Sequence, residues 1–297
     1  MKEKIELLPT TLLVDEKHSI DELKFLANSL RLEFGWHYML DISWILSQLN
    51  SINEMHILDA GAGTGILQWF LAENGAEVLS VDRSSREYLP ARFRFRFRAR
   101  GLRESDLAPP LISLRTRAQQ TTSSMAAIKT ILSETRGMLT LQRSTGCVVV
   151  YNQDLISFRD IADDTLDAVV AVSALEHNEP DDLQFDVEEL LRVLKPGGLL
   201  APTLCAAKEQ DWYHKPSRGW CYTADSLRKH FNLPERAPDN YDHYDELFDA
   251  LQNCTELRVN LAKFYARSGD NGMPWGVWDP QYQPVGVCTN KHTTFNH

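Results

Sequence analysis

The chain has 297 residues, of which 43% are hydrophobic, and its formal net charge at pH 7 is −10. This length and apolar content predict one large folded domain or two small ones and exclude a disordered chain. The sequence contains no apolar run of about 18 residues and no basic-then-apolar leader, so we expect neither a membrane span nor a secretory signal. The five cysteines are odd in number and form no C-x-x-C pair. We therefore expect reduced thiols, a cytoplasmic location and no metal site.

Residues 1–22 are polar, have no strong periodicity and are expected to be loosely packed. Ser19 followed by Glu22 fits a capping box, which predicts the start of a helix there. Apolar residues then recur at helical spacing up to Leu49, and Gly35 is expected to separate two helices. The aromatic segment beside Gly35 either packs a helix on the sheet or closes over a ligand. In the second case His37 and Tyr38 are candidate substrate contacts.

Residues 56–82 carry the strongest pattern in the chain: a short apolar strand, a glycine turn, a helix of about ten residues and a second strand ending in Asp82. Gly61, Gly63 and Gly65 remove side chains where the backbone must turn sharply and lie against a ligand. Asp82 is placed to accept hydrogen bonds from two ribose hydroxyls. The sequence therefore predicts half of a nucleoside-binding site.

The spacing of these glycines differs from the dinucleotide fingerprint G-x-G-x-x-G, because Ile66 stands three places after Gly63. Asp59 would also repel a pyrophosphate, but it could face a sulfonium or an amino group. The run from Asp59 to Gly65 resembles motif I of the class I S-adenosylmethionine-dependent methyltransferases, and Asp82 matches the ribose-binding acid of that family. The resemblance implies that Asp59, Gly61, Gly63, Gly65 and Asp82 bind S-adenosylmethionine. A nicotinamide dinucleotide and a plain structural turn are the alternatives.

A long insertion follows Asp82, since the next expected strand is Cys147–Tyr151. Residues 84–143 hold twelve basic and four acidic side chains, a net +8, which leaves −18 for the rest of the chain. Residues 92–98 alternate Arg and Phe, which predicts either a strand with Phe on one face or an Arg-rich helix. Ser124–Leu141 is expected to be an amphipathic helix.

Three roles are open for this insertion: a solvated cationic face, a lid whose arginines bind a phosphate or carboxylate of a small substrate, and a docking arm for nucleic acid. The acidic remainder of the chain argues against the third role.

After the strand Cys147–Tyr151, Asp154 and Leu155 match the place where the same family commonly contacts the adenine. Leu166–Val172 is an apolar, β-branched run, which predicts a central parallel strand buried on both faces. The Leu-Glu-His triplet at residues 175–177 resembles the fourth motif of the small-molecule methyltransferases. His177 is the candidate general base, because its pKa can lie near neutrality. Alternatively, Glu176 and His177 only shape the methionine end of the cofactor pocket.

The rest of the chain continues the family pattern. Asp181–Leu194 is predicted to be a helix, and the Lys-Pro-Gly-Gly turn that follows leads into a strand over Leu199–Cys205. Residues 208–222 are expected to form a loop whose polar and aromatic side chains either contact the substrate or pack the loop: Trp212, Tyr213, His214, Arg218 and Trp220. Thr223 is expected to cap a helix, and a further helix is expected over Tyr244–Leu251. The last two strands are expected over Leu257–Ala266 and Pro284–Thr289.

The expected fold is one doubly wound α/β domain over residues 51–297, with a mainly parallel seven-stranded sheet, an antiparallel last strand and a cap insertion at about 84–146. Residues 1–50 are expected to form an N-terminal helical lid. The resemblance implies methyl transfer from S-adenosylmethionine to a small molecule, with an anionic, sugar or nucleotide acceptor preferred, and no nucleic-acid or membrane partner. Two alternatives remain: an RNA or protein methyltransferase that docks through the insertion, and a non-catalytic nucleoside-binding fold. The sequence says nothing of the oligomeric state.

Overall fold

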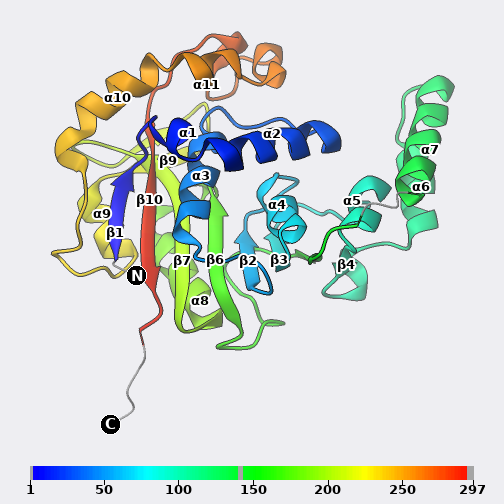
Figure 1. Cartoon of the computed structure of the whole chain (residues 1–297), viewed down its shortest axis with the longest axis horizontal. Coiled ribbons are helices and arrows are strands. Elements are labelled where there is room, and N and C mark those ends of the chain that lie inside the picture. The colour runs from blue at the N-terminus through cyan, green and yellow to red at the C-terminus, as the bar shows by residue number, and fades with distance from the viewer. Residues whose placement is uncertain (1–2, 140–142, 293–297) are drawn as a thin grey trace. The chain divides into compact units, whose positions relative to one another are not determined.

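The computed structural model of the chain describes residues 3–139 and 143–292 (Figure 1). It divides into two compact units, one formed by the chain up to Asn50 and again from Arg159 onward, the other by Ser51–Phe158. Among the helices in the described ranges, none combines the length and the apolar content needed to cross a membrane. All five cysteines lie in these ranges, and none of them forms a disulfide.

The first unit is built on a mixed sheet. Strands β6 (Leu166–Val172) and β7 (Leu194–Ala206) run parallel, β10 (Gln283–Asn290) pairs antiparallel with β7, and β1 (Lys4–Leu7) pairs antiparallel with β10 (Figure 1). Consecutive residues of β6 and β7 are buried, as in strands covered on both faces. The helices α3 (Tyr38–Gln48) and α8 (Pro180–Val193) both contact β7.

A hairpin of β8 (Trp212–His214) and β9 (Gly219–Tyr222) extends this sheet, with β9 parallel to β7. Thr223 caps α9 (Ala224–His230) as predicted, because its side chain accepts a hydrogen bond from the Ser226 amide at 3.3 Å. The other elements of the first unit are α1 (Leu12–Asp15), α2 (Lys17–Leu30), α9 (Ala224–His230), α10 (Tyr244–Gln252), α11 (Thr255–Val259) and the short 3₁₀ helices η2 (Leu175–His177), η3 (Tyr241–His243), η4 (Lys263–Arg267) and η5 (Pro274–Gly276).

The second unit is built on four parallel strands. Strand β3 (Glu77–Asp82) lies between β2 (His56–Ala60) and β5 (Cys147–Asn152), and the two-residue β4 (Arg100–Gly101) pairs with the outer side of β5. Helix α4 (Leu67–Glu73) packs on β3 and β5. The insertion contributes α5 (Ala91–Arg96), η1 (Glu104–Asp106), α6 (Pro110–Gln119) and α7 (Ser124–Met138).

The alternating Arg and Phe residues form the helix α5, so the helical alternative is confirmed. Phe93 and Phe97 are four residues apart and therefore lie on the same side of the chain. Both pack on Trp69, with ring centroids 4.7 and 4.9 Å away. Burial of these rings under α4 explains why the segment is helical, since a strand would place Phe95 on the same face.

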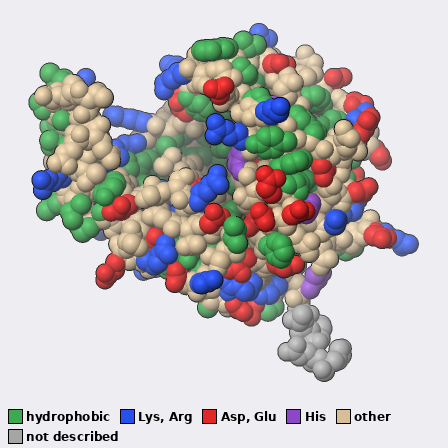
Figure 2. Space-filling model, turned by 180° about the vertical axis from the view of Figure 1, so that it is seen from behind, with side chains coloured by type: hydrophobic (Ala, Val, Ile, Leu, Met, Phe, Trp, Pro, Cys, Tyr) green, Lys and Arg blue, Asp and Glu red, His purple; other side chains and the backbone are tan. Residues whose placement is uncertain are grey.

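Helix α7 is confirmed, and Ser123 caps it by accepting a hydrogen bond from the Ala126 amide at 3.2 Å. The predicted end at Leu141 lies outside the described residues. The apolar side chains predicted to line one side of this helix do not pack within the chain, because Met125 and Leu132 are each 64% exposed. Figure 2 shows hydrophobic side chains on the surface of α6 and α7, at the left of the view.

The polar N-terminal segment is more ordered than predicted. Strand β1 buries Ile5 and Leu7 and leaves Lys4 and Glu6 partly exposed, an alternation too short to recognise in the sequence. Helix α2 begins at Lys17, so the predicted capping box is wrong and Ser19 lies inside the helix. Residues 1–2 of the segment lie outside the described part of the chain.

The strand predicted over Leu257–Ala266 is wrong, because this segment contains α11 and η4. The other six predicted strands are confirmed as β2, β3, β5, β6, β7 and β10, so the α/β class with parallel strands and an antiparallel last strand is confirmed. The described residues add β1, β4, β8 and β9, and the predicted loop over residues 208–222 is thus partly a hairpin. The division into a lid and one domain stays a prediction.

Candidate functional site

The glycine turn joins β2 to α4 in the second unit. Gly61 and Gly63 have φ values of +70° and +48°, the left-handed region that favours glycine. A Cβ on Gly65 would lie 3.1 Å from the carbonyl oxygen of Ala62, which is a tight contact. Helix α4 has seven residues and is shorter than predicted. The three glycines therefore let the backbone turn closely at the carboxyl end of β2.

Asp82 stands at the carboxyl end of β3, directly beside this turn. Its Oδ2 atom accepts a hydrogen bond from the Gly63 amide at 2.8 Å, and its Oδ1 atom accepts one from the Ser84 amide at 2.6 Å. The amide of Gln153 donates to the Asp82 carbonyl at 2.9 Å, which brings the loop after β5 to the same edge. That loop carries Asp154, which is half-buried, and Leu155, which is buried. The predicted glycines, Asp82, Asp154 and Leu155 thus gather at one edge of the second unit.

The side chain of Gln68 stabilises the glycine turn, and the sequence did not predict this role. Its Nε2 atom donates to the carbonyl oxygens of Ala62, Gly63 and Gly65 at 3.1 to 3.3 Å, and its Oε1 atom accepts from the Ser80 hydroxyl at 2.6 Å. The side chain is fully buried. The available signal was a single polar residue in the otherwise apolar run over residues 66–72.

Arg86 is a second residue that the sequence reasoning missed. Its guanidinium is buried and donates to the carbonyl oxygens of Ser80 and Tyr151 at 2.8 and 2.9 Å and to the Ser80 hydroxyl. Burial lowers the pKa of Arg86, while the charges of Asp82 and Asp59 oppose that effect. No sequence motif marks this arginine, because its role depends on carbonyl groups of two different strands.

Asp59 lies within β2 and is 2% exposed. Burial raises its pKa to about 7, the charge of Arg86 opposes this rise, and the charge of Asp82 adds to it. The carboxyl group of Asp59 therefore changes its protonation near neutral pH, unlike an exposed aspartate.

In the first unit, His177 ends η2 just after β6, and its side chain is exposed. Its Nδ1 atom lies 2.9 Å from the carbonyl oxygen of Arg218, in the turn between β8 and β9. Because a carbonyl can only accept, Nδ1 carries the proton in this contact, and the neutral ring leaves Nε2 with a free lone pair. This is the tautomer in which Nε2 can accept a proton.

Glu176 points into the first unit rather than to its surface, since it is 1% exposed. Its Oε1 atom accepts hydrogen bonds from the Ser173 hydroxyl and, at 3.5 Å, from the Cys205 thiol. Its Oε2 atom is buried without a hydrogen-bond partner. A Cβ on Gly219 would meet the Glu176 side chain at 3.0 Å, so a glycine is needed where β9 passes η2.

His37 and Asp41 form a buried pair at the start of α3, with Nδ1 and Oδ2 2.5 Å apart. Burial raises the pKa of Asp41, and its contacts with His37 oppose this rise. The Nε2 atom of His37 lies 3.4 Å from the hydroxyl of Tyr282. The neighbouring Tyr38 ring also packs on His37, and burial raises the pKa of its hydroxyl.

Tyr282 brings together two predicted residues from distant parts of the first unit. Its ring lies 5.7 Å from that of His37 and 5.1 Å from that of His214, both in edge-on contact. His214 is buried, which lowers its pKa, and its Nδ1 atom lies 2.7 Å from the Ser217 hydroxyl. The sequence reasoning missed Tyr282, for which the only signal was an aromatic residue just before the last strand.

The other predicted substrate contacts of the β8–β9 hairpin are spread over its two faces. Trp212 packs edge-on against His214, with ring centroids 5.6 Å apart. Tyr213 points the opposite way, is 42% exposed and packs on Trp220. Arg218 has an exposed side chain and contributes its carbonyl group to His177. Only Trp212 and His214 therefore join the cluster around Tyr282.

A comparison with protein families finds a match between residues 123–201 and the family model described as a methyltransferase domain. The matched stretch contains Asp154, Glu176 and His177, and the glycine turn lies before it. The matched domain is of the class that the sequence resemblance predicted, a methyltransferase, and the match covers about a quarter of the chain. No match is found among curated proteins.

Among solved structures, the chain is similar to the [4+2]-cyclase SpnF, with 16% identity over 98% of this chain and 100% of that chain and a TM-score of 0.44. For the 1,6-didemethyltoxoflavin-N1-methyltransferase of Burkholderia thailandensis, the identity is 12% over 94% and 88% of the two chains, and the TM-score is 0.44. For the magnesium protoporphyrin IX methyltransferase of Synechocystis PCC 6803, the identity is 14% over 93% of this chain and 82% of that chain, and the TM-score is 0.39. At these scores the likenesses carry no argument about function.

Proposed function

We propose that the chain is a methyltransferase that binds S-adenosylmethionine at the carboxyl edge of β2, β3 and β5. The match of residues 123–201 to a methyltransferase domain supports this proposal. The observation that carries this proposal is the hydrogen bond from the Gly63 amide to Oδ2 of Asp82. This bond holds the Asp82 carboxylate beside the turn. Gly63 has no side chain at this point, where a Cβ would lie 3.7 Å from Oδ2 of Asp82.

Each residue at this edge has a proposed task. Bound S-adenosylmethionine supplies a methyl group on a sulfonium, which is an excellent leaving group. Asp82 binds the ribose hydroxyls, because each carboxylate oxygen can accept more than the one bond it makes here. Asp154 and the backbone of Leu155 contact the adenine, and the turn from Gly61 to Gly65 lies against the cofactor. Asp59 faces the sulfonium or the amino group.

His177 is the proposed general base. Its exposed ring and its Nδ1 contact with the Arg218 carbonyl support this role, because they leave Nε2 available to take a proton from an acceptor. The alternative is that Glu176 and His177 only shape a pocket. Burial of Glu176 supports that alternative for Glu176 alone.

The proposed acceptor is a small molecule, and an anionic, sugar or nucleotide acceptor stays the preferred class. The cluster of His37, Tyr282 and His214 gives no direct support to this class, because its side chains are buried and contact one another, Asp41 and Ser217. A nucleic-acid docking arm has less support. Arg96 pairs with Glu73 at 2.9 Å, and Arg98 donates to the carbonyl oxygens of Thr145 and Gly146, so these arginines are engaged inside the second unit.

Calorimetric titration of the full chain with S-adenosylmethionine and S-adenosylhomocysteine tests the cofactor assignment, with NAD as a control. Saturable binding of both sulfur nucleosides and none of NAD is the expected result. Binding of NAD alone, or of none of the three, would overturn the proposed site. Incorporation of label from methyl-labelled S-adenosylmethionine into a panel of phosphorylated and carboxylated small molecules then tests the acceptor class.

A further inference from the structure

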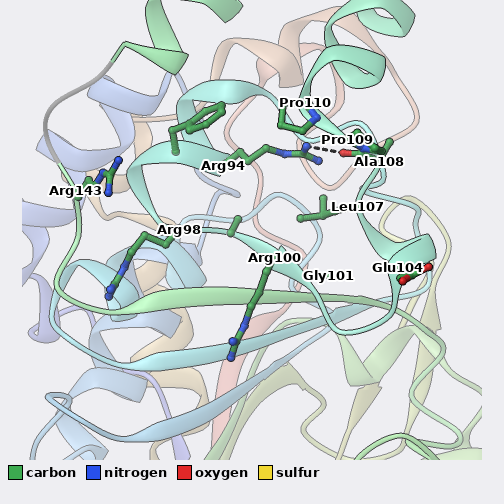
Figure 3. Close-up of a pocket in the computed structure, with 12 residues that line it drawn as sticks. Arg94, Arg98, Arg100, Gly101, Glu104, Leu107, Ala108, Pro109, Pro110 and Arg143 are labelled. Carbon is green, nitrogen blue, oxygen red and sulfur yellow. Dashed lines mark hydrogen bonds between the residues drawn. The ribbon is translucent and has the colours of Figure 1, made fainter.

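The second unit contains a pocket of about 750 Å³ beside the edge strand β4 (Figure 3). This is the size of a typical small-molecule site. Its charged lining consists of four arginines and one acid: Arg94, Arg98, Arg100, Arg143 and Glu104. The segment 107–110 supplies apolar wall, and Figure 3 shows the Arg94 side chain reaching toward Ala108.

Arg94 is the unusual member of this set, because it is only 8% exposed. Its Nη1 atom donates to the Ala108 carbonyl at 2.5 Å, while its Nε and Nη2 atoms are buried without a hydrogen-bond partner. Burial lowers the pKa of Arg94, and the charge of Glu134 opposes this effect. A buried donor without a partner is destabilising, so two on one guanidinium indicate a group that is satisfied by something else.

The two open nitrogens have the geometry of an anion receptor. Nε and Nη2 form one edge of the planar guanidinium, and two N–H groups on such an edge match two oxygens of a carboxylate or a phosphate. A single water oxygen could also accept from both N–H groups, but it carries no negative charge to balance the buried guanidinium. The arrangement therefore favours an oxyanion with at least two oxygens.

The other arginines leave the pocket positively charged. Arg98 donates to the carbonyl oxygens of Thr145 and Gly146 at 2.5 and 2.9 Å, which positions its charge without neutralising it. Arg100 pairs with Glu77 at 2.6 Å, so its charge is compensated. Arg143 is exposed at the rim. Against these cations the lining has a single acid, Glu104.

The pocket is distinct from the proposed cofactor edge of the same unit. Arg98 contacts Thr145 and Gly146, just before β5, and Arg100 in β4 pairs with Val149 in the middle of that strand. Leu107 and Ala108 line the pocket from the segment after η1, and Asp82 is not among the lining residues. Asp82 pairs instead with Asn152, at the carboxyl end of β5. We propose that this pocket binds the phosphate or carboxylate group of a small organic molecule, held by the Nε–Nη2 edge of Arg94. This site is independent of the proposed methyl transfer.

The test is a calorimetric titration of the full chain with inorganic phosphate and, separately, with citrate, at constant ionic strength. Arg94→Gln removes the receptor edge, Arg143→Gln removes a rim charge, and Arg115→Gln removes the same charge from an exposed position on α6 that does not line the pocket. We expect saturable binding to the wild type and to Arg115→Gln with equal affinity. Arg94→Gln should bind at least tenfold more weakly and Arg143→Gln a few-fold more weakly.

The two probes separate the sources of the anion, because tighter binding of phosphate indicates a phosphorylated ligand and tighter binding of citrate a carboxylated one. Absence of saturable binding of both probes by the wild type would overturn the proposal. Equal affinities of the wild type and Arg94→Gln would do the same. If Arg94→Gln fails to fold, Arg94→Lys, which keeps the charge but not the two-donor edge, takes its place together with Arg143→Gln. Equal affinity of those two variants and the wild type then contradicts the proposal.

Discussion

The backbone amide of Gly63 and the Oδ2 atom of Asp82 lie 2.8 Å apart, although the two residues are 19 positions apart in the chain. This bond ties the turn after β2 to the end of β3, and the parallel register of the two strands, with Ala60 opposite Val81, brings the two groups to the same edge. One carboxylate therefore both stabilises the turn and stands where a ribose is proposed to bind.

Replacing Asp82 by Ala should lower the affinity for S-adenosylmethionine at least tenfold. A hydrogen bond to a charged group contributes roughly 1.5–3 kcal/mol, and about 1.4 kcal/mol corresponds to a factor of ten. Calorimetric titration measures the change. Glu77→Ala, at the opposite end of the same strand, is the matched control and should keep the wild-type affinity. Equal affinity of Asp82→Ala and the wild type would show that the ribose is bound elsewhere.

The stability of the protein should depend on pH through Asp59. Its pKa is about 7 in the folded chain, whereas an aspartate in an unfolded chain has a pKa of about 3.9. Between these values the unfolded chain releases the proton and the folded chain keeps it, so the folded state binds more protons. The free energy of unfolding contributed by this group therefore falls as the pH rises through that window.

The side chain introduced by Asp59→Asn cannot ionise, so the free energy of unfolding of this variant should not show this fall with rising pH. Relative to the wild type, its free energy of unfolding should increase with pH, by up to about 4 kcal/mol for a shift of about three pKa units. Denaturant unfolding at a series of pH values measures the difference. Asp249→Asn, on the exposed side of α10, controls for the loss of one carboxylate. A constant difference between Asp59→Asn and the wild type would contradict the raised pKa.

His177 should be protonated on Nδ1 when its ring is neutral, because the Arg218 carbonyl accepts a hydrogen bond from that atom. Nuclear magnetic resonance of ¹⁵N-labelled histidine distinguishes the two ring nitrogens. A neutral ring protonated on Nε2 would remove the argument for His177 as a base. Once an acceptor is identified, His177→Ala should lower turnover by roughly 10²–10⁴ if His177 acts as a general base. It should leave the affinity for S-adenosylmethionine unchanged, whereas a loss of that affinity would assign His177 to shaping the pocket.

The helix α5 predicts unequal effects of its phenylalanines on stability. Phe93 is 2% exposed and stacks on Trp69, so Phe93→Ala should cost about 3–5 kcal/mol of unfolding free energy. Phe95, two residues along, is only half-buried and should cost much less. Denaturant unfolding of the two alanine variants makes the comparison. Equal losses would fit a strand with both rings on one face and would contradict the helix.

Patterns that are local in the sequence predicted their elements correctly. The apolar run Leu166–Val172 is β6 with the same bounds, and Thr223 caps α9 as expected. Burial on both faces needs only a nearly continuous apolar run, here interrupted once by Asp167, and a cap needs only one hydroxyl at the right position. The error over Leu257–Ala266 arose because its apolar residues fit short helices as well as a strand, and the segment contains α11 and η4.

The sequence by itself determined the α/β class, six of the strands and the gathering of glycines with Asp82, since spacing and residue type decide these directly. Only the tertiary structure decided which side chains support the site. Gln68 and Arg86 bind carbonyl groups of the turn and of separate strands, and Tyr282 joins His37 to His214 across the first unit. Arg86 and Tyr151, and Tyr282 and His37, are far apart in the chain, whereas Gln68 lies close to its partners. In each case the partners are backbone groups that every residue shares or rings without a fixed spacing. No local pattern can therefore reveal them.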